Sequence, residues 1–177
     1  MCRSLGAFVA LATVLLAVVA AQPVSASADA ARTVSARNEL ESSLLQQINT
    51  LRRQHGLVPL RVNLRLRAAA DAHSGAMAAQ GFFAHESSNG TQFWQRVQRH
   101  YTKTRYWSVG ENLLWSSPEV DGAGALTMWL NSAPHRKNLL TARWREIGLS
   151  AVHVDAGPGV YRGLPVTIVT ADFGVRR

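Results

Sequence analysis

The spacing of apolar residues changes partway along the chain, and this change limits the fold more than any other feature. Over residues 40–51 they recur every three or four positions, which places them on one face of a helix. Near the C-terminus, residues 147–151 alternate between apolar and small residues, and residues 166–173 are rich in Val, Ile and Thr. The Gly/Pro-rich segment DAGPGVYRGLP separates these two stretches. Helices followed by an antiparallel hairpin predict an α+β domain, with the helices covering the sheet.

Four helices are predicted, and several have a recognisable start or end. Asn38 and Glu41 resemble a capping pair, Asn63 is placed to cap the second helix, and Gly81 is placed to end it. His73 falls among the core positions of that second helix, so we expect a hydrogen-bonded core histidine rather than a ligand. The predicted helices cover about residues 38–55, 63–80, 91–100 and 123–130.

The first 28 residues have the layout of a secretory signal peptide. Arg3 precedes an unbroken apolar run from Ala7 to Ala21, and the small residues Ala26-Ser27-Ala28 follow. The run is shorter than the roughly 20 residues that span a bilayer. We therefore expect cleavage after Ala28 and a secreted protein, extracellular or periplasmic, that is not transmembrane after cleavage. An uncleaved membrane anchor is the alternative.

The remaining residues have the length of one domain. Residues 29–37 are small and polar and are predicted to form a flexible lead-in, and residues 38–177 are predicted to form a single domain. The only cysteine, Cys2, lies within the predicted signal peptide. The mature protein would therefore have no disulfide, and its stability would come from burial alone.

The chain is basic, with 19 Lys and Arg against 11 Asp and Glu. Such a charge draws a protein to anionic cell-envelope surfaces or to nucleic acid. The basic residues occur as scattered pairs such as Arg96 with Arg99, and no block of five is present. We therefore expect Arg96 and Arg99 to be exposed on their helix. No nucleic-acid-binding motif is present in the sequence, so a specific nucleic-acid partner is not expected.

The stretch WLNSAPHRKNLL, with the preceding triplet GEN, contains the candidate functional residues. Pro134 cannot lie inside a helix, so the helix that carries Trp129 should stop near Ser132. This would leave His135 on a sharp corner, where it can face a cleft. Glu111, between Gly110 and Asn112, is expected on irregular backbone. We expect the side chains of Glu111 and His135 to meet.

Six segments in this order resemble those of one known family. They are RRQHGLVPL, AAADAHSGAMAAQGFFAH, VGENLLW, WLNSAPHRKNLL, EIGLS and TADFG, and they extend over about residues 41–174. The chain resembles the CAP superfamily (cysteine-rich secretory, antigen 5 and pathogenesis-related 1 proteins, or SCP-like domains) in its cysteine-free bacterial form. The resemblance implies an α-β-α sandwich.

The same resemblance implies a cleft that commonly holds two histidines and two glutamates. His85 and His135 match the histidines and Glu111 matches one glutamate, whereas the fourth position falls on Ser132. Asn112 and Ser132 would line the cleft beside them. Various members of the superfamily bind lipids or sterols, which implies a lipid or another small hydrophobic ligand here.

Three functions follow from these residues. The first is binding of a ligand in the His/Glu cleft. The second is a metal-dependent hydrolase, because two imidazoles and one carboxylate (His85, His135 and Glu111) are a sufficient set for a divalent metal such as zinc, with water in the fourth position. The third is a cell-envelope adhesion module held by its basic surface. The alternative to all three is a purely structural role, in which Glu111 orients the histidines by hydrogen bonding and the cluster stabilises the cleft. A serine hydrolase built on Ser132 lacks the G-x-S-x-G turn.

Overall fold

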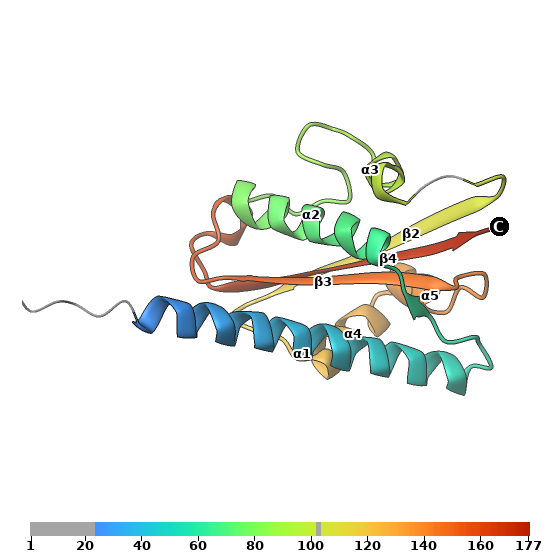
Figure 1. Cartoon of the computed structure of the whole chain (residues 1–177), viewed down its shortest axis with the longest axis horizontal. Coiled ribbons are helices and arrows are strands. Elements are labelled where there is room, and N and C mark those ends of the chain that lie inside the picture. The colour runs from blue at the N-terminus through green and yellow to red at the C-terminus, as the bar shows by residue number, and fades with distance from the viewer. Residues whose placement is uncertain (1–23, 102–103) are drawn as a thin grey trace, which may run out of the picture.

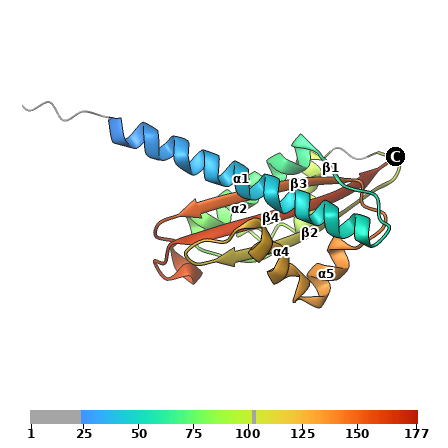
Figure 2. The same ribbon diagram turned by 90° about the horizontal axis from the view of Figure 1, so that it is seen from below.

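A sheet between two layers of helices forms the body of the protein. The computed structural model describes residues 24–101 and 104–177. The helices α2 and α3 cover one face of the sheet, and α1, α4 and α5 cover the other (Figures 1 and 2). This confirms the α+β class and the sandwich architecture. The helices are α1 (Val24–Gln54), α2 (Leu64–Gln80), α3 (Phe93–His100), α4 (Gly122–Leu130) and α5 (Ala133–Leu139), and the strands are β1 (Arg61–Val62), β2 (Trp107–Ser116), β3 (Glu146–Val154) and β4 (Val166–Arg176).

The predicted C-terminal hairpin is the centre of the sheet. The strand order is β1-β3-β4-β2, with β3 and β4 antiparallel and joined by a loop that contains a short 3-10 helix (Gly159–Tyr161). Both faces of β4 are buried. Its side chains alternate between the α1 layer, where Val169 and Phe173 pack, and the α2 layer, where Ile168 packs against Met77. A strand buried on both faces explains why this segment is almost continuously apolar.

The helix α1 begins earlier than its sequence predicts. Residues 29–37 are helical rather than a flexible lead-in, and Asn38 lies inside the helix rather than at its cap. Arg37 stabilises this part of the helix with one tertiary ion pair, to Asp71 of α2 at 2.6 Å, and one pair within α1, to Glu41 at 3.2 Å. Glu41 is therefore a buried partner rather than a capping residue, and it also accepts a hydrogen bond from the backbone of Ala151. Small polar residues do not prevent a helix when such bonds are available.

The predicted signal peptide lies mostly outside the described residues, so its cleavage stays a prediction. Among the described residues, no helix combines the length and apolarity that crossing a bilayer requires.

The second helix follows its prediction closely. Asn63 accepts hydrogen bonds from the backbone of Arg65 and Leu66, and Gly81 ends the helix with φ of 69°. Gly148 of β3 allows α2 to approach the sheet, because a Cβ atom at this position would overlap the backbone of Leu66 and Arg67. The alanine-rich face of α2 and this glycine together set the spacing between helix and sheet.

Two local predictions around the candidate site are wrong. Glu111 lies within the regular strand β2, which pairs with β4 over its whole length, rather than on irregular backbone. Pro134 does not leave His135 on an open corner, because it lies in the first turn of α5 and His135 follows it in that helix. A proline is tolerated there because the first N–H groups of a helix have no intrahelical partner.

The close approach at Gly148 gives a test of the layer spacing. Gly148→Ala should lower the free energy of unfolding by about 3 kcal/mol, because backbone atoms of α2 must move away. Gly75→Ala is the matched control: it lies within α2, a Cβ atom there meets nothing within 4 Å, and the change should raise stability by about 0.5–1 kcal/mol. Urea unfolding of both variants measures this. Equal stability of the two variants would contradict the packing argument.

Candidate functional site

Glu111 is the buried charge around which the candidate site forms. Its side chain is 1% exposed and carries a partner on each carboxylate oxygen. Oε1 accepts a hydrogen bond from Nδ1 of His85 at 2.8 Å, and Oε2 pairs with Nη2 of Arg96. His85 comes from the α2–α3 connection and Arg96 from α3. Both oxygens of Glu111 are thus bonded to His85 and Arg96, and neither is bonded to His135, the partner expected from the sequence.

Arg96 is buried, which contradicts the expectation that it faces solvent. Its Nη1 also donates to the backbone carbonyl of His85 at 2.8 Å, so one guanidinium bonds both the strand and the connection. Helix α3 lies against β2 and presents Arg96 to Glu111, whereas Arg99 is exposed as predicted. Periodicity within α3 could not identify the buried residue, because an arginine is expected at the surface unless a buried carboxylate meets it.

Asp172 is a second buried carboxyl group that the sequence analysis did not identify. It lies directly opposite Glu111 in the antiparallel β2–β4 pair, so both side chains project from the same face of the sheet. Burial and, next, the Glu111 carboxylate raise the pKa of Asp172 well above its usual value. A protonated Asp172 can donate a hydrogen bond to Glu111, which a second carboxylate cannot do. The one signal in the sequence is an acid within the apolar stretch VTIVTADFGV.

We refer to Glu111, Arg96, His85 and Asp172 as the Glu111 centre. The hydrogen bond to Glu111 is the main cause that raises the pKa of His85. Since Nδ1 of His85 donates to Glu111, its other ring nitrogen is left to contact solvent or a ligand. The side chain is 47% exposed, so such contact is sterically accessible.

His73 has the structural role that was expected of it. It lies in α2 with 1% exposure, and Nε2 is 2.9 Å from the carbonyl oxygen of Ala84. Burial lowers the pKa of His73, so its imidazole favours the neutral form. The prediction of a hydrogen-bonded core histidine is confirmed.

His135 lies on α5, beside the opposite face of β2. Asn112 donates from Nδ2 to the carbonyl of His135 at 3.1 Å. Asn138 donates to the side chain of Asn112 and to the carbonyl of Glu111. Burial, and then the charge of His85, lower the pKa of His135. The two asparagines therefore attach α5 to the edge strand, and His135 is near enough to His85 for their charges to interact.

Ser132 takes no part in these contacts. It occupies the N-cap position of α5, and its side chain makes no capping hydrogen bond. Within residues 24–101 and 104–177, no three His, Cys, Asp or Glu side chains are grouped as a metal site requires. Glu111 is already bonded to Arg96 and His85, and a guanidinium against the carboxylate opposes a nearby cation. The set of His85, Glu111 and His135 therefore does not fit a three-ligand metal site.

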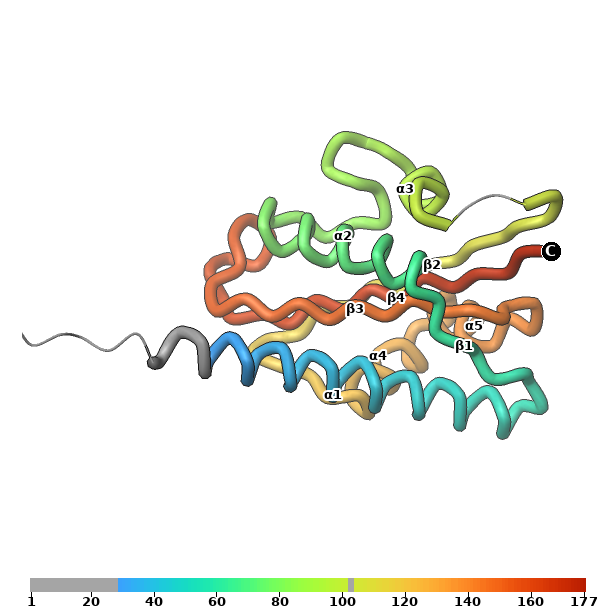
Figure 3. Tube along the Cα trace, in the orientation of Figure 1, coloured from blue at the N-terminus to red at the C-terminus, as the bar shows by residue number. Residues whose placement is uncertain are grey.

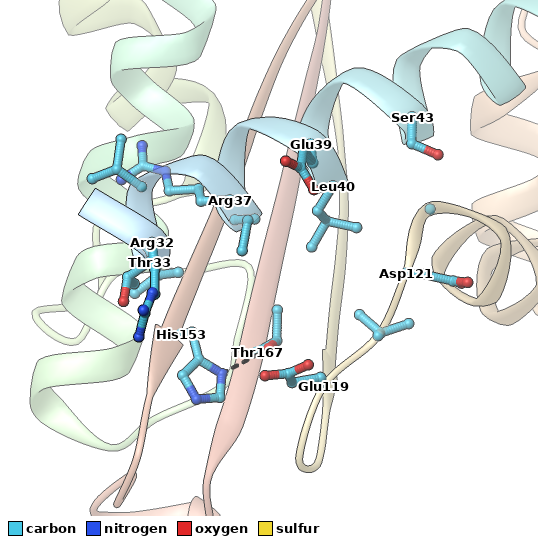
Figure 4. A pocket seen from close by; sticks show the side chains of 16 residues that line it. Arg32, Thr33, Arg37, Glu39, Leu40, Ser43, Glu119, Asp121, His153 and Thr167 are labelled. Carbon is cyan, nitrogen blue, oxygen red and sulfur yellow. Dashed lines mark hydrogen bonds between the residues drawn. The ribbon is translucent and has the colours of Figure 1, made fainter. Parts of the chain in front are cut away.

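The larger of two described cavities lies elsewhere, beneath the N-terminal half of α1 (Figure 4). Its volume is about 580 Å³, and we call it the α1 groove. None of the predicted site residues lines it. Polar side chains on its margins include Glu39, Glu119 and His153, and Nδ1 of His153 is 3.0 Å from Oγ1 of Thr167. Apolar side chains also line it, from Val34, Ala36, Leu40, Val120, Ala151 and Val152.

The sequence matches one known protein family and is similar to two Bacillus subtilis proteins. The cysteine-rich secretory protein (CAP) family profile matches residues 45–173. Two Bacillus subtilis proteins, the uncharacterised membrane protein YlbC and the uncharacterised protein YkwD, are each 30% identical over 62% and 63% of this chain. The chain spans only 30% and 42% of their lengths.

Solved structures show the same fold. An extracellular protein with an SCP domain from Bacillus anthracis is 26% identical, with a TM-score of 0.64 over 89% of this chain and 45% of that one. A cysteine-rich secretory protein from Staphylococcus aureus is 20% identical, with a TM-score of 0.55 over 77% of this chain and 40% of that one.

The buried ion pair gives a stability test. Arg96→Met removes one partner and leaves the Glu111 carboxylate buried without its countercharge, so the free energy of unfolding should fall by about 3–5 kcal/mol. Arg99→Met, on the exposed side of the same helix, should change it by less than about 0.5 kcal/mol. Denaturant unfolding measures both. Adding Glu111→Gln to Arg96→Met should recover much of the lost stability, because it removes the unpaired charge. If stability does not recover, the loss in Arg96→Met does not come from the Glu111 carboxylate.

Asp172 gives a pH test. Because folding raises the pKa of this carboxyl above its ordinary 3.8, its contribution favours the folded state below that value and is lost as pH rises towards the folded pKa. Asn stays neutral, so Asp172→Asn should gain stability relative to the natural protein between about pH 4 and pH 8. The exposed Asp155→Asn is the control. Denaturant unfolding at about pH 4 and about pH 8 measures the stability of both proteins. A stability gain of Asp172→Asn that is larger at about pH 4 than at about pH 8 would contradict the prediction.

Proposed function

Because the chain belongs to the cysteine-rich secretory protein (CAP) family, we propose that it is an extracellular protein that binds a lipid-like ligand in the α1 groove. The single observation that carries this proposal is the groove itself, whose volume of about 580 Å³ falls in the range of about 300–1,000 Å³ typical of small-molecule sites. The predicted signal peptide supports an extracellular location.

The lining of the groove defines the class of ligand. Val34 is 56% exposed although it is apolar, and Leu40 is only partly buried. Binding of an acyl chain would remove these side chains from water, which favours binding in proportion to the apolar area covered. Glu39, Glu119 and His153 at the margins can form hydrogen bonds with a polar head. An amphipathic ligand with one chain matches this lining better than a fully apolar or a fully polar one.

The Glu111 centre supports the fold more directly than it supports a reaction. Its carboxylate joins α3, the α2–α3 connection and β2, and its oxygens are bonded to His85 and Arg96. The metal-dependent hydrolase has less support, because the carboxylate meant for the metal is paired with a guanidinium. The exposed face of His85 favours a second candidate, in which a polar ligand binds at His85 and His135.

A fatty-acid probe can test the first candidate. Val34→Arg places a charge in the groove at an exposed position, so the fold should persist while displacement of a fluorescent fatty acid weakens roughly tenfold or more. Val160→Arg, at a similarly exposed position outside the groove, should leave the affinity unchanged. Fluorescence titration measures both variants.

His85→Ala separates the two candidate sites in the same titration. It should leave fatty-acid binding intact if the α1 groove is the site. Loss of binding in His85→Ala with full binding in Val34→Arg would instead identify the His85–His135 surface as the ligand site and refute the groove.

A further inference from the structure

Exposed arginines without a carboxylate partner lie together at one end of the protein. We propose that the end at which α1, β1 and β4 meet is a docking surface for an anionic phospholipid bilayer. This inference does not rest on the α1 groove. We call this surface the basic end and define it by five exposed arginines, Arg53, Arg61, Arg105, Arg143 and Arg177.

Sheet register and backbone bonds place these arginines at one end. Arg61 of β1 is opposite Glu146, the first residue of β3, and its N–H donates to the carbonyl of Arg145. Tyr106 and Arg177 exchange backbone hydrogen bonds where β2 begins and β4 ends. Figures 1 and 3 show the end of α1, β1 and the C-terminus together at this end.

The arginines of the basic end are not neutralised within the protein. No carboxylate of the described residues lies within 4.0 Å of any of the five, and the residues outside the described ranges include no Asp or Glu. Arg143 instead lies over the ring of Trp144, 4.8 Å from its centroid. Glu146, the acid nearby, is occupied by Asn63, Tyr101 and Arg176. Guanidinium groups held in this way are available for phosphate groups, whose geometry they match.

The other end of the molecule carries a group of acidic residues, alongside the exposed Arg32 and Arg162. Asp155 follows β3, Glu119 and Asp121 lie between β2 and α4, and Glu39 lies in the first half of α1. A charged protein with this polarity is oriented by an anionic surface before contact, with its basic end forward. The charge distribution therefore selects one end as the docking face.

Exposed apolar side chains at the same end favour a bilayer over a soluble polyanion. Leu64 is 75% exposed, Val62 54% and Val58 52%. Val58 and Val62 lie on the connection between α1 and α2 that contains Arg61, and Leu64 is the first residue of α2. Tyr106 is also exposed, beside Arg177. A phosphate or sugar polymer offers no apolar phase for Leu64 and Val62. A bilayer accepts apolar side chains at the boundary between headgroups and acyl chains while the arginines contact the phosphates.

Vesicle co-sedimentation tests the proposal. The purified protein should bind vesicles that contain phosphatidylglycerol and should bind pure phosphatidylcholine vesicles far more weakly, with the difference fading as salt rises. Arg61→Gln with Arg105→Gln should reduce binding to the anionic vesicles roughly 10- to 30-fold. Arg32→Gln with Arg162→Gln changes the net charge equally at the other end and should have little effect.

Apolar variants identify the kind of anionic partner. Leu64→Ser should weaken vesicle binding roughly 5- to 10-fold, whereas Leu164→Ser, exposed at the other end, should not. Thermal unfolding checks that all variants are folded. Equal effects of the two arginine pairs would overturn the basic end as the contact surface. Unchanged vesicle binding in Leu64→Ser, with dextran sulfate binding lost in the Arg61/Arg105 variant, would overturn the bilayer and identify a soluble polyanion.

Discussion

The buried bond between Arg96 and Glu111 holds the connection between α2 and α3 against the sheet. A carboxylate with 1% exposure is costly unless it is paired and hydrogen-bonded. Arg96 of α3 and His85 of the α2–α3 connection supply those partners. The same guanidinium bonds the backbone of His85. The bonds that pair the buried Glu111 carboxylate with Arg96 and His85 therefore also fix the position of His85 at the surface.

The pairing of β2 with β4 explains why this charge lies where it does. Because opposite residues of an antiparallel pair project from one face, Glu111 and Asp172 become neighbours beneath the α2 layer. The next residue, Asn112, projects to the other face and bonds the carbonyl of His135 on α5. One edge strand thus connects both helical layers through consecutive polar residues. Two imidazoles from opposite sides of the sheet come near each other at that edge.

Two surfaces are separate from this centre and differ in chemistry. The α1 groove lies under the N-terminal half of α1 with apolar side chains and charged side chains of both signs, and the basic end lies where α1 finishes. The length of α1 sets the distance between them. Different residues would contact a lipid-like ligand in the groove and an anionic bilayer at the basic end. Either interaction can therefore be absent without affecting the other.

The sequence alone determined the α+β class, the second helix with Asn63 and Gly81 at its ends, and the C-terminal hairpin. These depend on local periodicity, on capping chemistry and on motifs that lie close together in the chain. Only the tertiary structure decided that Arg96 is buried, that Asp172 faces Glu111, that residues 29–37 are helical and that the larger cavity lies under α1. Each of these depends on a partner from a distant segment, because the burial of a charge and the length of a helix depend on what packs against them.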